Sequence, residues 1–476
     1  MQIFSFSPFG YEGALVAVEV DLRRGIPAVD VVGLADGAVK ESRERMRSAI
    51  RNSGFEFPQE RVLISLSPAD LKKEGAGFDL ALALAVLQAK SRLPGAAKAP
   101  AFPPEPSLPE AVLVMGELEL SGAVRAVKGV QAAVSTAAAA GIRYCIVSSA
   151  NGAEAREVPG MKVFAAATLA EAYEVLFSPG HFSDGACPDD AFLPEGALSV
   201  EGVLFPALAA GMDFSDVQGQ GLLVRALQVA AAGGHNLLAF GPPGCGKTLA
   251  LQRFPALLPL LTVEEAQSVT RIHSIAGLLS PSQPLVRIPP FRQPHQTASI
   301  EGLCGGGPCC RPGEISLAHN GVLFLDEAAE FRTACLQMLR VPLESGQVSI
   351  SRAGRTTVYP ANFQLLMATN PCPCGNYGVS GRLCLCSARS VEQYWRKFSG
   401  PLLDRIAIRV AVGIGEPEPA SGELPAAGSR RQALSTADLR VEIARAVAFQ
   451  RRRQGKRNAR LSPQEMLACC SLGREE

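Results

Sequence analysis

The segment that most constrains the fold of this chain is the run GPPGCGKT at residues 241–248. An apolar run, NLLAF, precedes it, and a run typical of a helix, LALQRF, follows it. Glycines at such a turn let successive backbone N–H groups face one anion, and the helix N-terminus adds its positive end. Strand, loop and helix together predict a nucleotide-binding α/β domain, rather than a Gly- and Pro-rich turn with an idle lysine.

This run supplies the groups that bind the phosphates of ATP. Lys247 would neutralise the β- and γ-phosphates, and the Thr248 hydroxyl would bind Mg²⁺. The predicted nucleotide-binding set is Gly241, Pro242, Pro243, Gly244, Cys245, Gly246, Lys247 and Thr248, together with Asp326 further along the chain.

Two later apolar runs end in residue types that ATP hydrolysis uses. GVLFLDE ends in Asp326, which would hold Mg²⁺ through its shell, and in Glu327, which would polarise the attacking water as general base. FQLLMATN ends in Asn370, whose carboxamide would orient that water or sense the γ-phosphate. In SGPLLDRI, Arg405 would reach the nucleotide of a neighbouring subunit, or else form a surface salt bridge with Asp404.

Four of the 13 cysteines lie in NPCPCGNYGVSGRLCLC, as two Cys-x-Cys pairs. They are Cys372, Cys374, Cys384 and Cys386. Four thiolates suit a closed, structural Zn²⁺ site, although the spacing is not the usual C-x-x-C. Packing without a ligand and a redox role remain alternatives, and a disulfide within Cys-x-Cys would be strained.

A further segment, GQVSISRAGRTTVYP, predicts a β-hairpin with Arg352 and Arg355 beside its tip. In a ring, such a hairpin would point into the pore, where guanidinium groups suit DNA phosphates. A solvated tip is the alternative. The basic run at residues 450–460 is either a solvated helix face or a second DNA contact.

The composition excludes several classes of protein. Of 476 residues, 47% are hydrophobic and 19% charged, which is a globular balance, and the net charge of +1 argues against a chain that coats DNA by charge alone. No apolar run is long enough for a membrane span, and the N-terminus lacks a signal-peptide pattern. We therefore expect a cytoplasmic protein without a membrane partner, whose cysteines are reduced thiols or metal ligands.

Differences in the residue pattern along the sequence divide the chain into four parts. Residues 1–176 alternate strand-like and helical runs, as an α/β or α+β domain does. Residues 177–199 form a punctuated linker, residues 200–414 carry the nucleotide-binding signals, and residues 415–476 contain a flexible segment and then a basic helical stretch.

The order of the phosphate loop, GVLFLDE, ATNPCPCG and SGPLLDRI resembles the Mg-chelatase-like AAA+ ATPases, in the ComM/YifB branch. FDLALALAVL and GELELSGAVRAVKGVQAA extend the resemblance over nearly the whole chain. It implies a ring-forming, hexameric AAA+ ATPase that uses ATP and Mg²⁺ and acts on branched or single-stranded DNA, in branch migration during natural transformation. A magnesium chelatase-type motor subunit acting through protein partners, or an ATP-binding module with little turnover, are the alternatives.

The resemblance also implies the fold class, which is α/β, with an N-terminal α+β domain similar to the Lon protease fold ahead of the P-loop AAA+ domain. Where that fold carries its serine and lysine, this chain has KEGAGFD and Ala133, so we expect no protease activity. Gln296 and Ala407 stand where the family usually has a histidine and an acidic residue. The family's helical lid with its second arginine sensor has no counterpart after LSPQEMLACC, so we expect a truncated lid.

Overall fold

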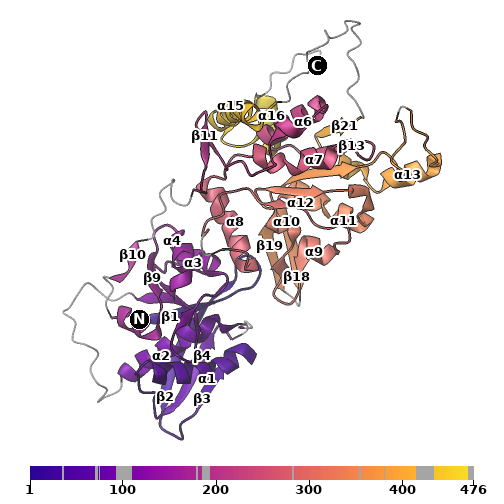
Figure 1. The fold of residues 1–476 in the computed structure, drawn as a ribbon. Helices are drawn as coiled ribbons and strands as arrows, with labels where there is room; N and C mark the ends of the chain where they lie inside the picture. The colour runs from indigo at the N-terminus through magenta and orange to yellow at the C-terminus, as the bar shows by residue number, and fades with distance from the viewer. Residues whose placement is uncertain are drawn as a thin grey trace.

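The computed structural model describes residues 1–34, 37–69, 73, 75–92, 110–177, 181–184, 193–280, 283–352, 355–379, 381–413 and 434–469. Two large sheets, each with its own helices, follow one another along the chain (Figure 1). The first is drawn in indigo and purple, and the second in magenta to yellow. Among the described helices, none combines the length and apolarity that a membrane span needs.

The N-terminal sheet has eight strands in the order β10-β9-β8-β5-β1-β2-β4-β3. Neighbours from β1 through β5 and β8 to β9 run parallel, whereas β1–β2 and β2–β4 are antiparallel. This mixture agrees with the α/β or α+β character predicted for this part. The strands are β1 (Gln2–Ser7), β2 (Ala14–Arg23), β3 (Val29–Val32), β4 (Arg61–Ser67), β5 (Ala111–Met115), β8 (Tyr144–Ser148), β9 (Lys162–Ala166) and β10 (Ser183–Asp184).

A buried helix forms the centre of this domain. Helix α2 (Asp79–Ser91) is buried from Asp79 to Leu87, because it is apolar on every face after its first residue. Asp79 itself is paired with Arg45, at 2.8 Å between Nε and Oδ2. The other described elements here are α1 (Gly37–Asn52), η1 (Ala76–Phe78), β6 (Glu117–Leu118), β7 (Val124–Arg125), α3 (Val130–Ala139), η2 (Ser149–Asn151), α4 (Gly152–Arg156) and α5 (Leu169–Val175).

The second sheet is entirely parallel, with five strands in the order β14-β17-β20-β13-β21. Its central strands are buried on both faces and are therefore almost continuously apolar in sequence. Because the strands are parallel, all of their carboxyl ends meet at one edge. The strands are β13 (Leu237–Phe240), β14 (Phe291–Arg292), β17 (Val322–Leu325), β20 (Gln364–Thr369) and β21 (Ile408–Ala411).

Helices cover this sheet, and three short ribbons extend from it. The helices are η4 (Phe214–Asp216), α6 (Gly221–Gly233), α7 (Lys247–Gln252), η5 (Phe254–Leu257), α8 (Val263–Ala276), α9 (Ile300–Cys304), α10 (Glu314–Leu317), η6 (Ala328–Glu330), α11 (Thr333–Met338), α12 (Arg340–Ser345), α13 (Ala388–Arg396), α14 (Gly400–Leu403), α15 (Thr436–Gln454), η7 (Asn458–Arg460) and α16 (Pro463–Cys469). The ribbons are β11 (Leu198–Val200) with β12 (Val203–Phe205), β15 (Gly305–Gly306) with β16 (Arg311–Pro312), and β18 (Gln347–Arg352) with β19 (Arg355–Pro360).

Helix α15, which belongs to the predicted C-terminal segment, packs on the domain of the second sheet. A capping box between Ser435 and Asp438 begins it. Leu439 and Ile443 are buried in the same hydrophobic core as Leu227 of α6. The predicted flexible segment at residues 415–433 lies outside the described residues.

Helix α8 joins the two domains. It packs against α3 of the N-terminal domain. Its Arg271 donates to the carbonyl oxygen of Tyr11 at 3.0 Å, and the guanidinium carbon lies 4.6 Å from the centre of the Tyr11 ring. That ring in turn contacts Tyr359 of β19 edge-on, with 5.9 Å between ring centres. The N-terminal domain therefore touches both α8 and the base of the β18–β19 hairpin.

Candidate ATP site and cysteine cluster

The run GPPGCGKT forms a loop between β13 and α7, as the sequence predicts. Three of its glycines are required by the backbone. A Cβ at Gly241 would lie 1.9 Å from the carbonyl oxygen of Val412, and Gly244 and Gly246 have φ values of +80° and +85°, which L-residues with side chains rarely adopt. The loop and the N-terminus of α7 thus lie at the carboxyl edge of the parallel sheet, where backbone N–H groups can bind phosphate.

Lys247 is the first residue of α7 and is buried. Its Nζ donates to the carbonyl oxygens of Gly241, at 2.7 Å, and Pro242, at 2.8 Å. It also lies 3.4 Å from Oδ1 of Asn370, which follows directly on β20. The phosphate loop and the predicted sensor asparagine are therefore in contact.

Thr248 and Asp326 face each other across the same edge. The Thr248 hydroxyl donates to Oδ1 of Asp326 at 3.0 Å, and the backbone N–H of Glu327 donates to that same oxygen at 3.0 Å. A hydroxyl and a carboxylate this close are the oxygen ligands that Mg²⁺ uses beside nucleotide phosphates, so these residues fit the ion. Glu327 is exposed and left-handed, with a φ of +48°, a strained backbone of the kind found at functional sites.

The structure thus brings together Lys247, Thr248, Asp326, Glu327 and Asn370, which lie far apart in sequence. Tyr394 of α13 supports the sensor strand, because its hydroxyl is 2.9 Å from Oγ1 of Thr369. Burial raises the pKa of the Tyr394 phenol, which keeps it protonated. The arrangement can bind a triphosphate and a divalent cation and can place a carboxylate beside an attacking water.

Arg405 lies at the opposite edge of the sheet. Its carbonyl oxygen accepts a hydrogen bond, at 2.8 Å, from Asn236, which precedes β13. Its guanidinium forms an ion pair with Glu344 of α12, and not with the neighbouring Asp404, which is the partner in the salt-bridge alternative. Arg405 is thus separated from Lys247 of its own chain by the length of a strand.

Gln220, before α6, is a site residue that the sequence reasoning missed. Its Nε2 donates to the carbonyl oxygen of Cys245 at 2.8 Å and to that of Gly413 at 3.4 Å. Gln220 therefore ties the phosphate loop to the end of β21. No motif spacing marks this glutamine, because its role depends on tertiary contacts alone.

The predicted hairpin is present as β18 and β19, with Arg352 paired in register with Arg355. Val348 and Ile350 are buried on one face, and Arg352 is exposed near the tip. Ala353, Gly354 and the side chain of Arg355 lie outside the described part of the chain.

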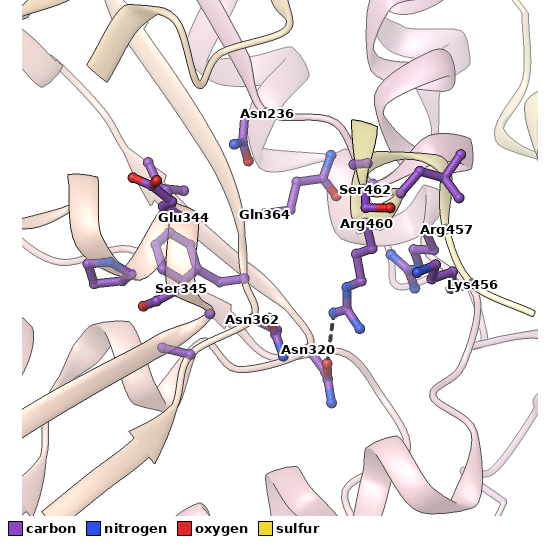
Figure 2. Close-up of a pocket in the computed structure, with 18 of the residues that line it drawn as sticks. Asn236, Asn320, Glu344, Ser345, Asn362, Gln364, Lys456, Arg457, Arg460 and Ser462 are labelled. Carbon is purple, nitrogen blue, oxygen red and sulfur yellow. Dashed lines mark hydrogen bonds between the residues drawn. The ribbon is translucent and has the colours of Figure 1, made fainter. Parts of the chain in front are cut away.

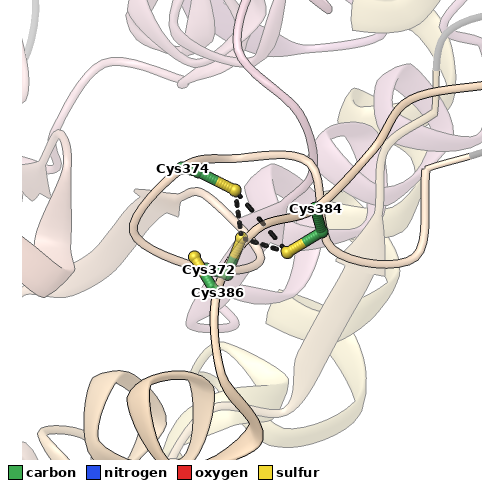
Figure 3. A group of neighbouring side chains, drawn as sticks. All are labelled: Cys372, Cys374, Cys384 and Cys386. Carbon is green, nitrogen blue, oxygen red and sulfur yellow. Dashed lines mark hydrogen bonds between the residues drawn. The ribbon is translucent and has the colours of Figure 1, made fainter.

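The four cysteines of NPCPCGNYGVSGRLCLC converge (Figure 3). Their Sγ atoms all lie within 4.8 Å of one another. Cys372 is buried and Cys374 exposed, while Cys384 and Cys386 are half-buried.

Part of the basic run at residues 450–460 lines a cavity of about 400 Å³ at the amino edge of the parallel sheet (Figure 2). Arg460 donates to Oδ1 of Asn320 at 2.9 Å, and Lys456 pairs with Glu465 at 2.7 Å. These two cations are therefore engaged in internal contacts. The arginines in the last turn of α15 are exposed.

The comparisons with known proteins agree with this geometry. The family model described as "Magnesium chelatase, subunit ChlI" matches residues 213–419, and "Subunit ChlI of Mg-chelatase" matches residues 18–151. An uncharacterized protein of Mycobacterium tuberculosis is 40% identical over 449 residues, which is 94% of this chain and 82% of that protein.

Two further relatives cover almost all of this chain. The uncharacterized protein YifB of Escherichia coli is 39% identical over 467 residues, 98% of this chain and 85% of YifB. The competence protein ComM of Haemophilus influenzae is 37% identical over 472 residues, 99% of this chain and 86% of ComM. Identity of this extent confirms the resemblance seen in the motifs. The chain therefore belongs to the Mg-chelatase-like family of AAA+ type, in the branch that contains YifB and ComM.

Proposed function

We propose that this chain is the subunit of a homo-oligomeric ring ATPase, a hexamer, that couples ATP hydrolysis to movement on branched or single-stranded DNA, as in branch migration during natural transformation. One observation supports ATP hydrolysis most directly. Two contacts meet at one edge of the sheet, Thr248–Asp326 at 3.0 Å and Lys247–Asn370 at 3.4 Å.

Each side chain at this edge has one task in the proposed reaction. Lys247 would neutralise the transferred phosphoryl group, and Thr248 and Asp326 would hold Mg²⁺, which supplies charge stabilisation to the phosphates when bound. The exposed carboxylate of Glu327 would accept a proton from the attacking water. Asn370 would hold that water in line, because its amide offers a donor and an acceptor.

The position of Arg405 supports a ring. Arg405 lies at the amino edge of the sheet, opposite the phosphate loop of its own chain, so a catalytic role would require the nucleotide of a neighbouring subunit. The ion pair with Glu344 would hold the guanidinium in one orientation until that neighbour binds.

Two observations support DNA as the substrate. The hairpin carries exposed Arg352 at its tip, while its base is fixed by the buried Tyr359, so that it could transmit movement of the ATPase domain to a phosphate backbone. The ComM relative is named a competence protein, which agrees with the role in natural transformation that the family resemblance implies. We infer DNA contact at Arg352 and Arg355.

We infer that the N-terminal domain, of proposed Lon-like fold, does not cleave peptides. Ala76 lies between Gly75 and Gly77 where a nucleophilic serine would stand, and Ala133 is fully buried in α3 where the base would stand. Neither side chain can attack a carbonyl or move a proton. Its contacts with α8 suit a scaffold or a docking module.

The test is ATP hydrolysis by the purified chain, with and without a four-way DNA junction, beside a Lys247→Ala variant. We expect turnover that the junction stimulates and that the variant loses by about 10²-fold or more. Turnover that is indifferent to DNA and rises with chelatase partners would favour the chelatase-type motor. ATP binding without turnover would favour a binding module.

A further inference from the structure

We propose that Cys372, Cys374, Cys384 and Cys386 hold a structural Zn²⁺ ion, and that this ion fixes the phosphate loop through the contact between Gly375 and Pro243. The metal site is independent of the proposed function. Its effect on ATP turnover rests on that function. We refer to residues 371–379 and 381–387, which lie between β20 and α13, as the cysteine loop.

The spacing of the sulfur atoms suits one tetrahedral ion. Cys372 Sγ lies 3.3 Å from Cys374 Sγ and 3.7 Å from Cys384 Sγ, and the last two are 3.6 Å apart. Zinc–thiolate bonds of about 2.3 Å place tetrahedral ligands about 3.8 Å from one another. A disulfide would require a sulfur separation of about 2.05 Å, so these cysteines are not bonded in pairs.

The surroundings of the sulfur atoms argue against the alternative that the four cysteines only pack together as apolar side chains without a ligand. Leu383 is 78% exposed and Leu385 is 84% exposed, whereas Cys384 and Cys386, which alternate with them, turn toward the other thiols. An apolar cluster would bury the leucines first, because they carry more apolar area than a thiol does. In this part of the cysteine loop, the sulfur atoms therefore face one another, whereas the two leucines face solvent.

A backbone hydrogen bond supports one of the four proposed zinc ligands. The N–H of Tyr377 donates to Sγ of Cys372 at 3.3 Å. Hydrogen bonds of this kind orient metal-bound thiolates and offset part of their charge. With four sulfur ligands and no open position, the ion would be structural rather than catalytic.

The cysteine loop lies directly against the ATP site. A Cβ on Gly375 would lie 2.6 Å from Cδ of Pro243, so the glycine backbone packs on the phosphate loop itself. On the other side, Nε1 of Trp395 donates to the carbonyl oxygen of Pro371 at 2.9 Å, and its ring contacts Phe240, the last residue of β13, edge-on. A metal that fixes this loop thereby also limits movement of Pro243.

The first experiment measures the zinc content of the purified chain, prepared under reducing conditions without added metal or chelator. We expect about one zinc per chain, and loss of most of it in the double variant Cys384→Ser/Cys386→Ser. Cys469→Ser in α16, outside the cluster, is the matched control and should keep its zinc. Wild-type protein with no zinc and four freely reactive thiols would overturn the proposal.

A second measurement covers the case in which the double variant does not fold. Wild-type chain in which Co²⁺ replaces zinc should show the absorption of tetrahedral cobalt with thiolate charge-transfer bands. A spectrum of six-coordinate cobalt would contradict the four-thiolate site.

The link to the phosphate loop is tested by two glycine variants of the cysteine loop. Gly375→Ala should keep its zinc but lower kcat/KM for ATP by about tenfold or more, because the new methyl displaces Pro243. Gly378→Ala is the matched control, since it has a similar φ of +72° but open space around its Cβ. Equal effects of the two variants would overturn the link. A wild-type chain that holds zinc but hydrolyses no ATP would refute only the proposed function, and ATP affinity would then be the readout.

Discussion

At the scale of single residues, the site depends on backbone and protonation states that one substitution can change. Glu327 adopts a left-handed conformation two residues after the end of β17, and its backbone N–H donates to Oδ1 of Asp326. This strained backbone lies between the two adjacent acids to which we assign separate tasks, Asp326 toward the cation and Glu327 toward water.

Replacement of Glu327 by glutamine should abolish turnover without loss of binding. The amide keeps the size of the side chain but cannot accept the proton, so we expect kcat to fall by about 10²- to 10⁴-fold while ATP affinity stays within about threefold. Phosphate release and a fluorescent-nucleotide titration measure the two quantities. Glu330→Gln, an exposed acid three residues away, should behave as wild type. Unchanged kcat in Glu327→Gln would exclude Glu327 as the base.

His319 is a second residue at this scale, and its surroundings set its protonation state. Its Nδ1 accepts from the backbone N–H of Asn362 at 3.1 Å, and its Nε2 lies 2.9 Å from Oγ of Ser268 on α8. Burial, with a smaller effect of Arg460, lowers its pKa to about 3. The ring is therefore neutral in the folded protein and links α8 to the loop before β20.

Stability should fall on acidification because of this histidine. The unfolded chain binds a proton below about pH 6.5, whereas folded His319 does not until about pH 3, so stability is lost as the pH falls between these values. At pH 5 the loss is about 2 kcal/mol. Denaturant unfolding at pH 7.5 and pH 5 measures it, and His319→Gln should show a smaller difference than wild type. His295→Gln, at an exposed site, should retain the wild-type difference; if His319→Gln retains it too, the assignment is wrong.

At the scale of elements, the β18–β19 hairpin connects the ATPase domain to the N-terminal domain. The Thr357 hydroxyl of β19 accepts from the backbone N–H of Tyr11 at 3.1 Å, and the Tyr359 hydroxyl donates to the carbonyl oxygen of Cys310 at 2.9 Å. The base is thus held on two sides, while the end that carries Arg352 is exposed.

Removal of the Arg352 guanidinium should weaken DNA binding and leave the ATP site intact. We expect Arg352→Ala to lose most of the DNA stimulation of turnover, to keep its DNA-free turnover, and to lower the slope of log K against log salt by about 1, because one phosphate contact is lost. Filter binding over a range of salt concentrations gives that slope. Arg23→Ala, which removes an exposed arginine from β2, is the control. Equal salt slopes for wild type and Arg352→Ala would place the DNA elsewhere.

At the scale of the whole molecule, the two halves of the proposed catalytic site lie at opposite edges of one sheet. Lys247 and Asp326 are at the carboxyl edge, and Arg405 is at the amino edge, where its carbonyl oxygen contacts Asn236. If Arg405 acts in catalysis as proposed, it would do so at the phosphate loop of a neighbouring chain in head-to-tail contact.

Mixing two inactive variants tests this arrangement. Lys247→Ala keeps Arg405, and Arg405→Ala keeps the phosphate loop, so a mixed ring contains some interfaces with both intact parts. We expect each variant alone to be inactive and an equimolar mixture to recover on the order of a quarter of wild-type turnover, as random assembly predicts. Arg409→Ala, an exposed arginine on β21, should not lose activity. Full activity of Arg405→Ala alone would rule out a role in trans.

The sequence by itself determined the local chemistry of this protein. The positions of Lys247, Thr248, Asp326, Glu327 and Asn370 were predicted from apolar runs that end in polar residues, because a buried strand must be apolar and its end is the first place where a functional group can face solvent. The hairpin was predicted in the same way, from alternation and a turn. The family was predicted from the order of these motifs and is confirmed by the relatives.

Only the tertiary structure decided which distant residues touch. The partner of Arg405 is Glu344, 61 positions away, and not its neighbour Asp404. Gln220, which supports the phosphate loop, has no motif. The sequence left zinc, packing and redox chemistry open for the four cysteines, and their convergence around one point, like the contact of Gly375 with Pro243, emerged only in three dimensions. The physical reason is that a strand or a turn depends on neighbouring residues, whereas these contacts depend on how separate strands and loops pack into one sheet edge.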